Sequence, residues 1–307
     1  MVDFSHQDLM HSHHSHSGSY VSHAVDDLDS IVAKAYSMGF KTFCLTEHMP
    51  RTSMNYLYPE EIEKSYTIES LNKNFNNYYE HAKRLQQEYK DKMEVLVGFE
   101  VEGTDKEHLL LAHSFKHKFD MCVGSVHFLH GIPIDFSVDK WEEAKSLTSD
   151  GTTRTLYKDY FQLQHLVIDT LKPSVIGHFD LIRLFETTEL VELSQWPEVY
   201  DQVVKNIQLV NSYGGLFELN SAAIRKGWDS PYPKPDMVKL ILELGGKFCL
   251  SDDSHGLAQI GLNYHKVWQY VKDMGITHIS HLTIRGTIEQ SVEELDGSSF
   301  WDQYKNL

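Results

Sequence analysis

The stretch at residues 40–48, FKTFCLTEH, is a short apolar run that ends in an acid and a histidine. The residues before it, 26–38, repeat apolar side chains at the spacing of one helical face, and Gly39 follows as a natural helix stop. A short apolar run directly after an amphipathic helix is typical of a strand in an α/β protein. We interpret this helix and strand as the repeating unit of the chain.

The same unit recurs along the sequence. The further apolar runs are MEVLVGFEVE (93–102), FDMCVGSVH (119–127), SVIGHFDL (174–181), GLFELNS (215–221), KFCLSDDSH (247–255) and ITHISHLTI (276–284). The segments between them with helical periodicity are 71–90, 155–171, 199–211, 234–244 and 264–274. Near-continuous apolar strands that alternate with helices predict a parallel sheet buried on both faces. About seven such units in 307 residues favour a barrel over an open sheet, with the whole chain, 1–307, as one domain.

Composition argues against several classes of protein. The formal net charge of -16 argues against a nucleic acid or an anionic membrane surface as partner. The three cysteines, Cys44, Cys122 and Cys249, lie far apart in apolar runs, so we expect reduced core residues. No apolar run reaches the length of a membrane span, and the N-terminus lacks the apolar stretch of a signal peptide. We therefore expect a cytoplasmic protein.

Histidine and acidic residues stand at the carboxyl ends of the predicted strands. The residues at or just past these ends are His48, Glu100, His127, His178, Asp253 and His255. A barrel gathers strand ends onto one face, and all six residues are of types that bind zinc, manganese or iron. A single histidine in an apolar run is more often a hydrogen-bonded core residue. Six such residues at equivalent positions instead predict a metal centre, over which the long segments 50–66 and 131–154 would lie.

A histidine-rich tract, MHSHHSHS at residues 10–17, precedes the first predicted helix, where the first strand of a barrel is expected. In an extended segment, alternate side chains point the same way. Two pairs therefore qualify as joint ligands, His14 with His16 or His11 with His13. The interruption by serines is unlike an affinity tag, and the spacing by itself leaves both pairs open.

These motifs, taken in order, resemble the PHP (polymerase and histidinol phosphatase) superfamily. The residues that carry the resemblance are His14-Ser15-His16-Ser17, His23, TEH at 46–48, GFE at 98–100, SVH at 125–127, GHFDL at 177–181 and SDDSH at 251–255. They span about four-fifths of the chain, and an ordered set is far more specific than any one motif. The segment ELNSAAIRKG at 218–227 is similar to one in histidinol-phosphate phosphatases of the fungal type.

The resemblance implies a distorted (β/α)7 TIM-like barrel with two or three divalent ions of zinc, manganese or iron at the C-terminal face of the strands. By motif, the metal ligands are His14, His16, His23, His48, Glu100, His127, His178, Asp253 and His255. The family's first motif usually carries an aspartate at the position of Ser12, so His11 and His13 stay the alternative pair. SDDSH has one acid more than the usual motif, and its D-x-H spacing selects Asp253 and leaves Asp252 behind the ligands.

The activity implied is hydrolysis of L-histidinol phosphate to L-histidinol and phosphate in histidine biosynthesis, with a metal-bridged hydroxide attacking phosphorus in line. The expected catalytic residues are Glu100, Asp253, His255 and Arg225, with Glu100 as the bridging carboxylate. The expected substrate-binding residues are Asn220, Ser221, Arg225, Lys226, Arg51 and Arg183. Arg225 and Lys226 would hold the phosphate, although an ordinary basic helix end looks the same. An acid on the mouth loops would bind the substrate amine, but the sequence selects none.

Three other functions compete with this interpretation. One is a PHP phosphoesterase acting on another small phosphate ester or a nucleotide, although segment 218–227 favours a small ester. Another is an amidohydrolase-type hydrolase, which commonly uses a carbamylated lysine where this chain has His127. A metal-storage or metal-sensing protein is the third, and it would not need Arg225 and Lys226. We expect a small-molecule substrate, phosphate as product, no nucleic acid and no membrane, and the sequence leaves a homo-oligomer open.

Three further histidines lie between the predicted strands at 93–102 and 119–127. His113 and His117 are four residues apart, which is the spacing of a zinc-binding pair on a helix, and His108 lies in the same helical stretch. Because this segment belongs to the outer ring of a barrel, we expect all three to lie on a solvated helix face.

Overall fold

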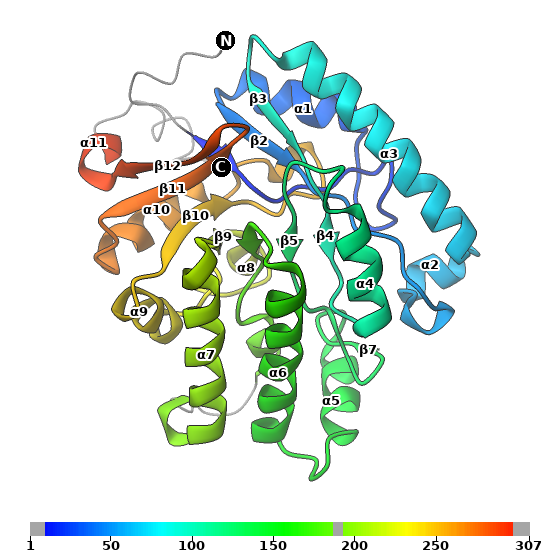
Figure 1. Cartoon of the computed structure of the whole chain (residues 1–307), viewed down its shortest axis with the longest axis vertical. Coiled ribbons are helices and arrows are strands. Elements are labelled where there is room, and N and C mark those ends of the chain that lie inside the picture. The colour runs from blue at the N-terminus through cyan, green and yellow to red at the C-terminus, as the bar shows by residue number, and fades with distance from the viewer. Residues whose placement is uncertain (1–9, 187–192, 297–307) are drawn as a thin grey trace.

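A computed structural model describes residues 10–186 and 193–296 of the chain (Figure 1). Its parallel strands are β1 (His11–Ser12), β2 (Thr42–Leu45), β3 (Glu94–Val97), β4 (Glu100–Val101), β5 (Val123–Gly124), β8 (Val175–Ile176), β9 (Leu216–Asn220) and β10 (Lys247–Ser251). They form two sheets with the orders β1-β2-β3 and β10-β9-β8-β5-β4. Every pair of neighbours in these sheets is parallel, so the predicted α/β class with parallel strands is confirmed.

The two sheets are linked by two parallel bridges. Isolated parallel bridges pair Ser15 with Ser254, just beyond β1 and β10, and His48 with Glu100, between β2 and β4. The backbone N–H of His16 donates to the carbonyl of Ser254 at 2.7 Å. Since the strands and both bridges run parallel, the carboxyl ends of all these strands face one side of the molecule.

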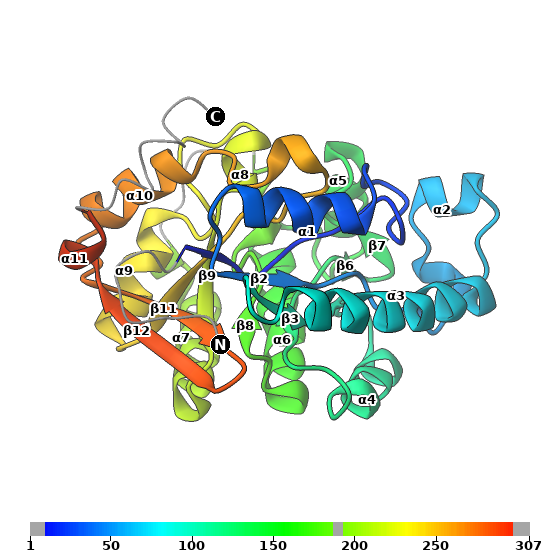
Figure 2. The ribbon, with the colours of Figure 1, turned by 90° about the horizontal axis from the view of Figure 1, so that it is seen from above.

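The helices lie outside the strands, as the two ribbon views show (Figures 1 and 2). The predicted amphipathic segments form α1 (Leu28–Ser37), α3 (Ile68–Tyr89), α6 (Thr153–Leu171), α7 (Pro197–Tyr213), α9 (Pro235–Glu243) and α10 (Tyr264–Asp273), so all six predictions are confirmed. The other helical elements are η1 (Met54–Tyr56), α2 (Pro59–Glu63), α4 (Lys106–Phe115), α5 (Val138–Ser146), η2 (Leu181–Arg183), η3 (Leu193–Gln195), α8 (Ala222–Arg225), η4 (Leu257–Gln259) and α11 (Val292–Asp296). Within the described part of the chain, none of them is long and apolar enough to cross a membrane.

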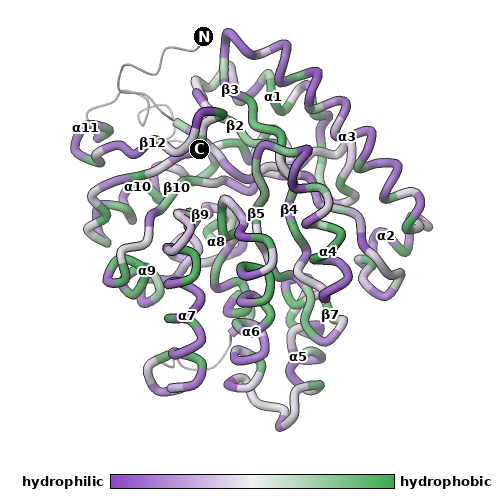
Figure 3. Tube along the Cα trace, in the orientation of Figure 1, coloured by the Kyte–Doolittle hydropathy of each residue, from purple (hydrophilic) through white to green (hydrophobic). Residues whose placement is uncertain are grey.

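The core lies between the strands and the helices. Strands β2 and β9 are buried at every position. This explains why their sequences are apolar runs without alternation. In Figure 3 the hydrophobic colour follows the central strands, whereas the outer helix α3 alternates between hydrophobic and hydrophilic turns. Cys44, Cys122 and Cys249 are buried and unpaired, as expected.

The run at 276–284 differs from the expected parallel unit. It contains β11 (His278–Thr283), which pairs with β12 (Gly286–Ser291) in an antiparallel hairpin. Only residues 284–285 connect the two strands, and so short a connection joins antiparallel strands because a parallel crossover needs a much longer segment. A second small hairpin, formed by β6 (Phe128–Leu129) and β7 (Ile132–Pro133), follows β5.

The two long segments predicted over the mouth both reach the functional cavity. Segment 50–66 contains η1 and α2, and segment 131–154 contains β7 and α5. Tyr58 and Glu60 from the first, and Asp135 and Phe136 from the second, line that cavity. The fold thus places strand-end residues below the cavity and loop residues around it.

Candidate metal-binding active site

A cavity of about 470 Å³ lies at the carboxyl ends of the strands. Eight of the nine predicted metal ligands line it: His16, His23, His48, Glu100, His127, His178, Asp253 and His255. The ninth, His14, is fully buried, and its Nε2 lies 3.1 Å from Oε2 of Glu100. The fold therefore brings together residues that are spread over most of the sequence.

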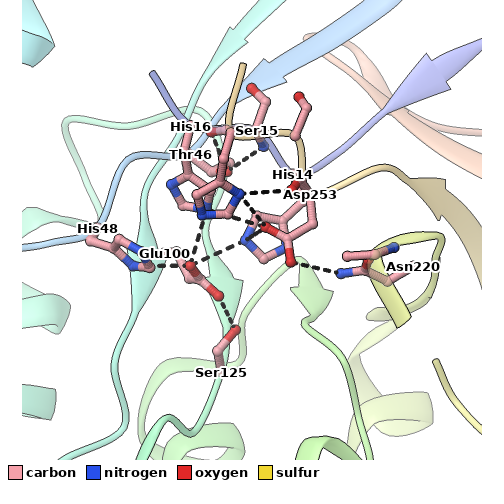
Figure 4. A network of polar contacts seen from close by, with 12 residues as sticks. His14, Ser15, His16, Thr46, His48, Glu100, Ser125, Asn220 and Asp253 are labelled. Carbon is pink, nitrogen blue, oxygen red and sulfur yellow. Dashed lines mark hydrogen bonds and ion pairs between the residues drawn. The ribbon is translucent and has the colours of Figure 1, made fainter. Parts of the chain in front are cut away.

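Glu100 lies at the centre of this group, and Figure 4 shows His14, His16 and His48 around it. The residues with an imidazole nitrogen within 3.3 Å of its carboxylate oxygens are His14, His16, His48, His127 and His178. Ser125 Oγ also donates to Oε1 at 2.6 Å. Burial by itself would raise the pKa of Glu100, but the histidines, His14 foremost, hold that pKa well below its usual range. An ionised carboxylate with imidazoles around both oxygens is suited to bridging two cations.

Asp253 supplies a second carboxylate. Its Oδ1 lies 3.6 Å from His14 Nε2, 3.5 Å from His16 Nε2 and 3.7 Å from His255 Nδ1. Its φ of 49° is in the left-handed region, which a residue other than glycine adopts only when its surroundings hold it there. Although burial raises it, the pKa of Asp253 is held well below its usual range by His14 and His16. Asp253 is therefore an ionised carboxylate on a constrained backbone.

His23 is the most exposed of the predicted ligands. Its side chain is 34% exposed, and its Nδ1 lies 3.1 Å from Oε1 of Glu60. Its ring centroid lies 5.4 Å from that of His48 and 5.0 Å from that of His255. The structure thus places His23 at the rim of the cavity, beside the other histidines.

The donor atoms of the cluster fit bound cations. Nε2 of His14, both ring nitrogens of His16 and Nε2 of His48 are buried and make no hydrogen bond to any residue in the described ranges. Three sets have donor atoms within 4.8 Å of one another: His16, His48 and His255; His14, His16 and Asp253; and His48, Glu100 and His127. Imidazoles mixed with carboxylates suit zinc, manganese and iron. A buried nitrogen without a partner costs about 1–3 kcal/mol unless a ligand such as a metal ion satisfies it.

Two carboxylates that the sequence analysis did not single out hold predicted ligands from behind. Glu218 Oε2 lies 3.1 Å from Nδ1 of His14, and Asp135 Oδ2 lies 3.3 Å from Nδ1 of His127. In both histidines the other ring nitrogen faces the cluster, so a carboxylate on Nδ1 sets the tautomer and the ring orientation that a metal ligand needs. The sequence contains one indication of this position of Glu218. Glu218 stands two residues before Asn220, the last residue of β9, so both side chains point to the same side of the strand.

Two further acids lie near the cluster, and the sequence pattern placed one of them, Asp252, behind the ligands. Glu102 Oε1 lies 2.7 Å from Nδ1 of His48. Asp252 instead accepts from Ser12 Oγ at 2.9 Å and from the backbone N–H of Gly261 at 2.8 Å. Asp252 therefore connects the first strand to the segment after β10, through Ser12 and a backbone N–H rather than through a predicted ligand.

The alternative pair, His11 and His13, lies away from the cavity. Nε2 of His11 accepts the backbone N–H of Leu250 at 2.9 Å, and Nε2 of His13 accepts that of Leu282 at 2.8 Å. The His11 ring also stacks on His281 of β11, with centroids 5.0 Å apart. A ring nitrogen that accepts a backbone N–H does not at the same time bind a metal, so this pair connects β1 to β10 and β11.

Arg225 and Lys226 both line the cavity, at the end of α8. Arg225 Nη2 donates to the backbone carbonyl of Asp253 at 3.2 Å, which holds the guanidinium beside the cluster. Asn220 and Ser221 are buried and are absent from the described residues that line the cavity. Asn220 Nδ2 donates to Oδ2 of Asp253 at 3.4 Å, so Asn220 contacts a predicted ligand rather than the cavity.

The structure does not bring Arg51 and Arg183 to the cavity. Both are buried, and neither is among the described lining residues. Arg51 Nη2 donates to Glu61 Oε1 at 2.9 Å, and Arg183 Nη1 donates to both carboxylate oxygens of Asp236, at 2.8 and 2.9 Å. Because carboxylates from other elements hold each guanidinium, neither side chain is placed as expected for a phosphate contact.

One expectation for the helical histidines is wrong. His113 and His117 are exposed, as expected of a solvated helix face. His108 of α4 is fully buried instead, and its Nε2 accepts the backbone N–H of Glu102 at 3.3 Å. His108 therefore supports the strand segment that carries Glu102.

Comparison with known proteins identifies relatives of this chain. Residues 12–222 match the family model of the PHP domain. Histidinol-phosphatase from Saccharomyces cerevisiae is 38% identical over 298 residues, which cover 86% of this chain and 89% of that protein. A probable histidinol-phosphatase from Schizosaccharomyces pombe is 41% identical over 271 residues, which cover 87% of this chain and 88% of that protein.

A solved structure has a similar fold. It is histidinol phosphate phosphatase from Lactococcus lactis subsp. lactis complexed with zinc, L-histidinol and phosphate, and it matches with a TM-score of 0.65 and 18% identity. The match covers 91% of this chain and 99% of that chain. At 18% identity, this match shows that the two proteins share a fold, and it shows no more than that.

Proposed function

The chain belongs to the PHP domain family, and on this premise we propose that it hydrolyses L-histidinol phosphate to L-histidinol and phosphate. In this proposal the protein is a histidinol-phosphatase, a phosphoric monoester hydrolase of histidine biosynthesis. Two relatives with that name, at 38% and 41% identity over most of each chain, support the substrate. The bacterial structure holds L-histidinol and phosphate, which are the two products of the reaction.

The observation that carries the proposal is that metal-binding and phosphate-binding side chains share one cavity. The imidazoles and carboxylates of the cluster line it, and Arg225 and Lys226 line it too. Hydrolysis of a phosphate ester needs both groups, since the ester is an anion and its attack requires an activated water. A metal-storage or metal-sensing protein has no use for two basic side chains beside its ligands.

We propose that the cluster holds two or three divalent ions of zinc, manganese or iron. The residues that would hold them are His14, His16, His23, His48, Glu100, His127, His178, Asp253 and His255. When bound, such ions supply an activated water and neutralise oxygens of the phosphate group. The three sets of converging donor atoms support more than one ion.

The chain's own residues orient the substrate and balance charge. Glu100 contributes an ionised carboxylate with imidazoles around both oxygens. Arg225 offers a planar fork of N–H donors and Lys226 a point charge, and together they bind phosphate oxygens. Arg225 donates to the backbone carbonyl of Asp253, and Asp253 and His255 line the same cavity, so both would act next to the phosphate group.

We also propose that the strands form one distorted (β/α)7 TIM-like barrel and that residues 1–307 are one domain. The bridges between Ser15 and Ser254 and between His48 and Glu100 support this arrangement, because the first joins the ends of β1 and β10 and the second joins the segment after β2 to β4. Strand β3 runs almost directly into β4, so the two occupy one position around the barrel.

Phosphate release from L-histidinol phosphate tests the proposed function. We expect purified protein to release phosphate, to lose activity on exhaustive chelation and to regain it with Mn²⁺ or Zn²⁺. A nucleotide and a sugar phosphate, assayed in parallel, should be poorer substrates. Protein that is loaded with metal, hydrolyses one of those esters and leaves L-histidinol phosphate intact would refute the assignment and favour another PHP phosphoesterase.

A further inference from the structure

Asp135, from the mouth segment 131–154, lines the cavity and has one carboxylate oxygen without a hydrogen-bond partner among the described residues. Its Oδ2 lies 3.3 Å from Nδ1 of His127, whereas its Oδ1 is buried and has no hydrogen-bond partner among the described residues. The side chain is 15% exposed and lines the cavity. A carboxylate oxygen shielded from water in this way is costly unless a donor is brought to it. A substrate that enters the cavity meets the exposed part of this side chain and can bring a donor to its carboxylate.

We propose that Asp135 binds the ammonium group of a substrate whose amine is separated from the phosphate ester oxygen by two carbon atoms. This inference rests on the proposed function, because L-histidinol phosphate carries its amine at that position. The short spacer means that the acid receiving the ammonium has to lie next to the phosphate site. Asp135 meets this requirement, since it contacts His127, whose Nε2 lies 2.9 Å from Glu100 at the centre of the cluster.

The charges around Asp135 agree with this position. Lys226 and His178 line the same cavity as Asp135. Lys226 is one of the two basic residues proposed to hold the phosphate. Asp135 therefore contacts a proposed metal ligand and shares the cavity with the proposed phosphate-binding residues, where the amine of a short amino ester would be.

Among the described residues that line the cavity, Glu60 is the other acid from the mouth segments. Its Oε1 lies 3.1 Å from His23 at the rim, and its side chain is 23% exposed. His23 in turn approaches the cluster only through ring contacts at 5.0 and 5.4 Å, to His255 and His48. An ammonium held at Glu60 would draw the ester toward the rim, so Asp135 is the better placed acid.

The variant Asp135→Asn tests the inference by comparing L-histidinol phosphate with its deamino analogue. We expect the ratio of kcat/KM between the amino ester and the deamino ester to fall about 10- to 100-fold, as for the loss of a hydrogen bond between charged groups. The value for the deamino ester should change much less. If Asp135 only orients His127, kcat/KM should fall by the same factor for both esters. That result would overturn the inference.

Two control variants define the comparison. Asp159→Asn removes a carboxylate that pairs with His130 at 3.0 Å outside the lining, and both esters should be turned over at the wild-type rate. Glu60→Gln should leave the ratio between the two esters near the wild-type value. The inference would be overturned if this kcat/KM ratio fell in Glu60→Gln and stayed at the wild-type value in Asp135→Asn. That result would assign the ammonium site to Glu60.

A second pair of esters separates this inference from the proposed function. Aminoethyl phosphate and ethyl phosphate differ by the same amine but lack the imidazole. If the protein leaves L-histidinol phosphate intact yet prefers aminoethyl phosphate through Asp135, the proposed function fails and the inference stands. If the protein hydrolyses L-histidinol phosphate but Asp135→Asn leaves the preference for the amino ester unchanged, the proposed function stands and the inference fails. If no ester is turned over, calorimetry of L-histidinol and its deamino analogue replaces the kinetic ratio, and equal affinities would overturn the inference.

Discussion

Replacing Glu218 by glutamine changes a single hydrogen-bonding atom behind the metal cluster. Oε1 of Glu218 accepts the backbone N–H of His178 at 2.6 Å and Nδ2 of Asn220 at 2.7 Å, whereas Oε2 lies 3.1 Å from Nδ1 of His14. A glutamine keeps one oxygen for the first two donors and turns its NH₂ group toward His14. Nδ1 of His14 then has to accept a hydrogen bond, so the ring proton moves to Nε2.

That shift places a proton on the nitrogen of His14 that faces the cluster, 3.1 Å from Oε2 of Glu100. A protonated nitrogen does not bind a metal ion, so the variant has to bind metal through its less favoured tautomer. Carboxylates behind metal-binding histidines contribute about 10- to 100-fold in affinity, or roughly 1.4–2.8 kcal/mol. Because glutamine has the same shape as Glu218, which is fully buried, we expect the metal-free variant to stay folded.

Competition with a chelator for Zn²⁺ measures the affinity, and circular dichroism monitors the fold. Glu289→Gln is the matched control, since it removes a carboxylate that pairs with Lys247 at 2.9 Å on the surface. We expect wild-type zinc affinity in that control. Wild-type affinity in folded Glu218→Gln protein would refute the argument that Glu218 sets the tautomer of His14.

Three further predictions address the cluster, the phosphate site and the fold. Glu100→Gln should lower kcat for L-histidinol phosphate by about 100-fold or more with an unchanged circular dichroism spectrum, and activity within tenfold of wild type would contradict its central role. Arg225→Ala should raise the inhibition constant of inorganic phosphate about 10- to 100-fold, while Arg154→Ala, which removes a surface partner of Glu198, should not. Burial lowers the pKa of His281 from 6.5 to about 4, so the unfolded chain binds the proton more tightly. This contribution to stability is complete above pH 6.5 and is lost as the pH falls toward 4, by about 2 kcal/mol between pH 7 and pH 5. Urea unfolding measures the free energy of unfolding at both pH values. Between pH 7 and pH 5 this free energy should fall by about 2 kcal/mol less in His281→Gln than in the wild type. Equal decreases in the two proteins would show that His281 does not cause the pH dependence.

Local pattern was sufficient for much of the fold. The six amphipathic segments became helices because apolar side chains at helical spacing bury one face, and this spacing is written in consecutive residues. The apolar runs became strands for the same local reason. The run at 276–284 shows the limit, because its apolar residues were compatible with a parallel strand and only the pairing with β12 makes it a hairpin.

The identity of side chains at strand ends pointed to the residues around the cavity, whereas their surroundings were invisible in the sequence. Arg51 and Arg183 stand after motif residues, yet Glu61 and Asp236 hold them away from the cavity. His108 lies on a helix whose other histidines are exposed, yet packing buries it. In these cases the deciding partner comes from another element, and no local spacing records it.

The sequence by itself determined the alternation of strands and helices and the residue types at the carboxyl ends of the strands, because both depend on periodicities within a single segment. Only the tertiary structure decided which histidine pair faces Glu100 and which carboxylate supports His14. Glu218, which does so, is 204 residues away along the chain. Contacts over such separations depend on how all the strands are placed around one another, so they exist only in the folded molecule.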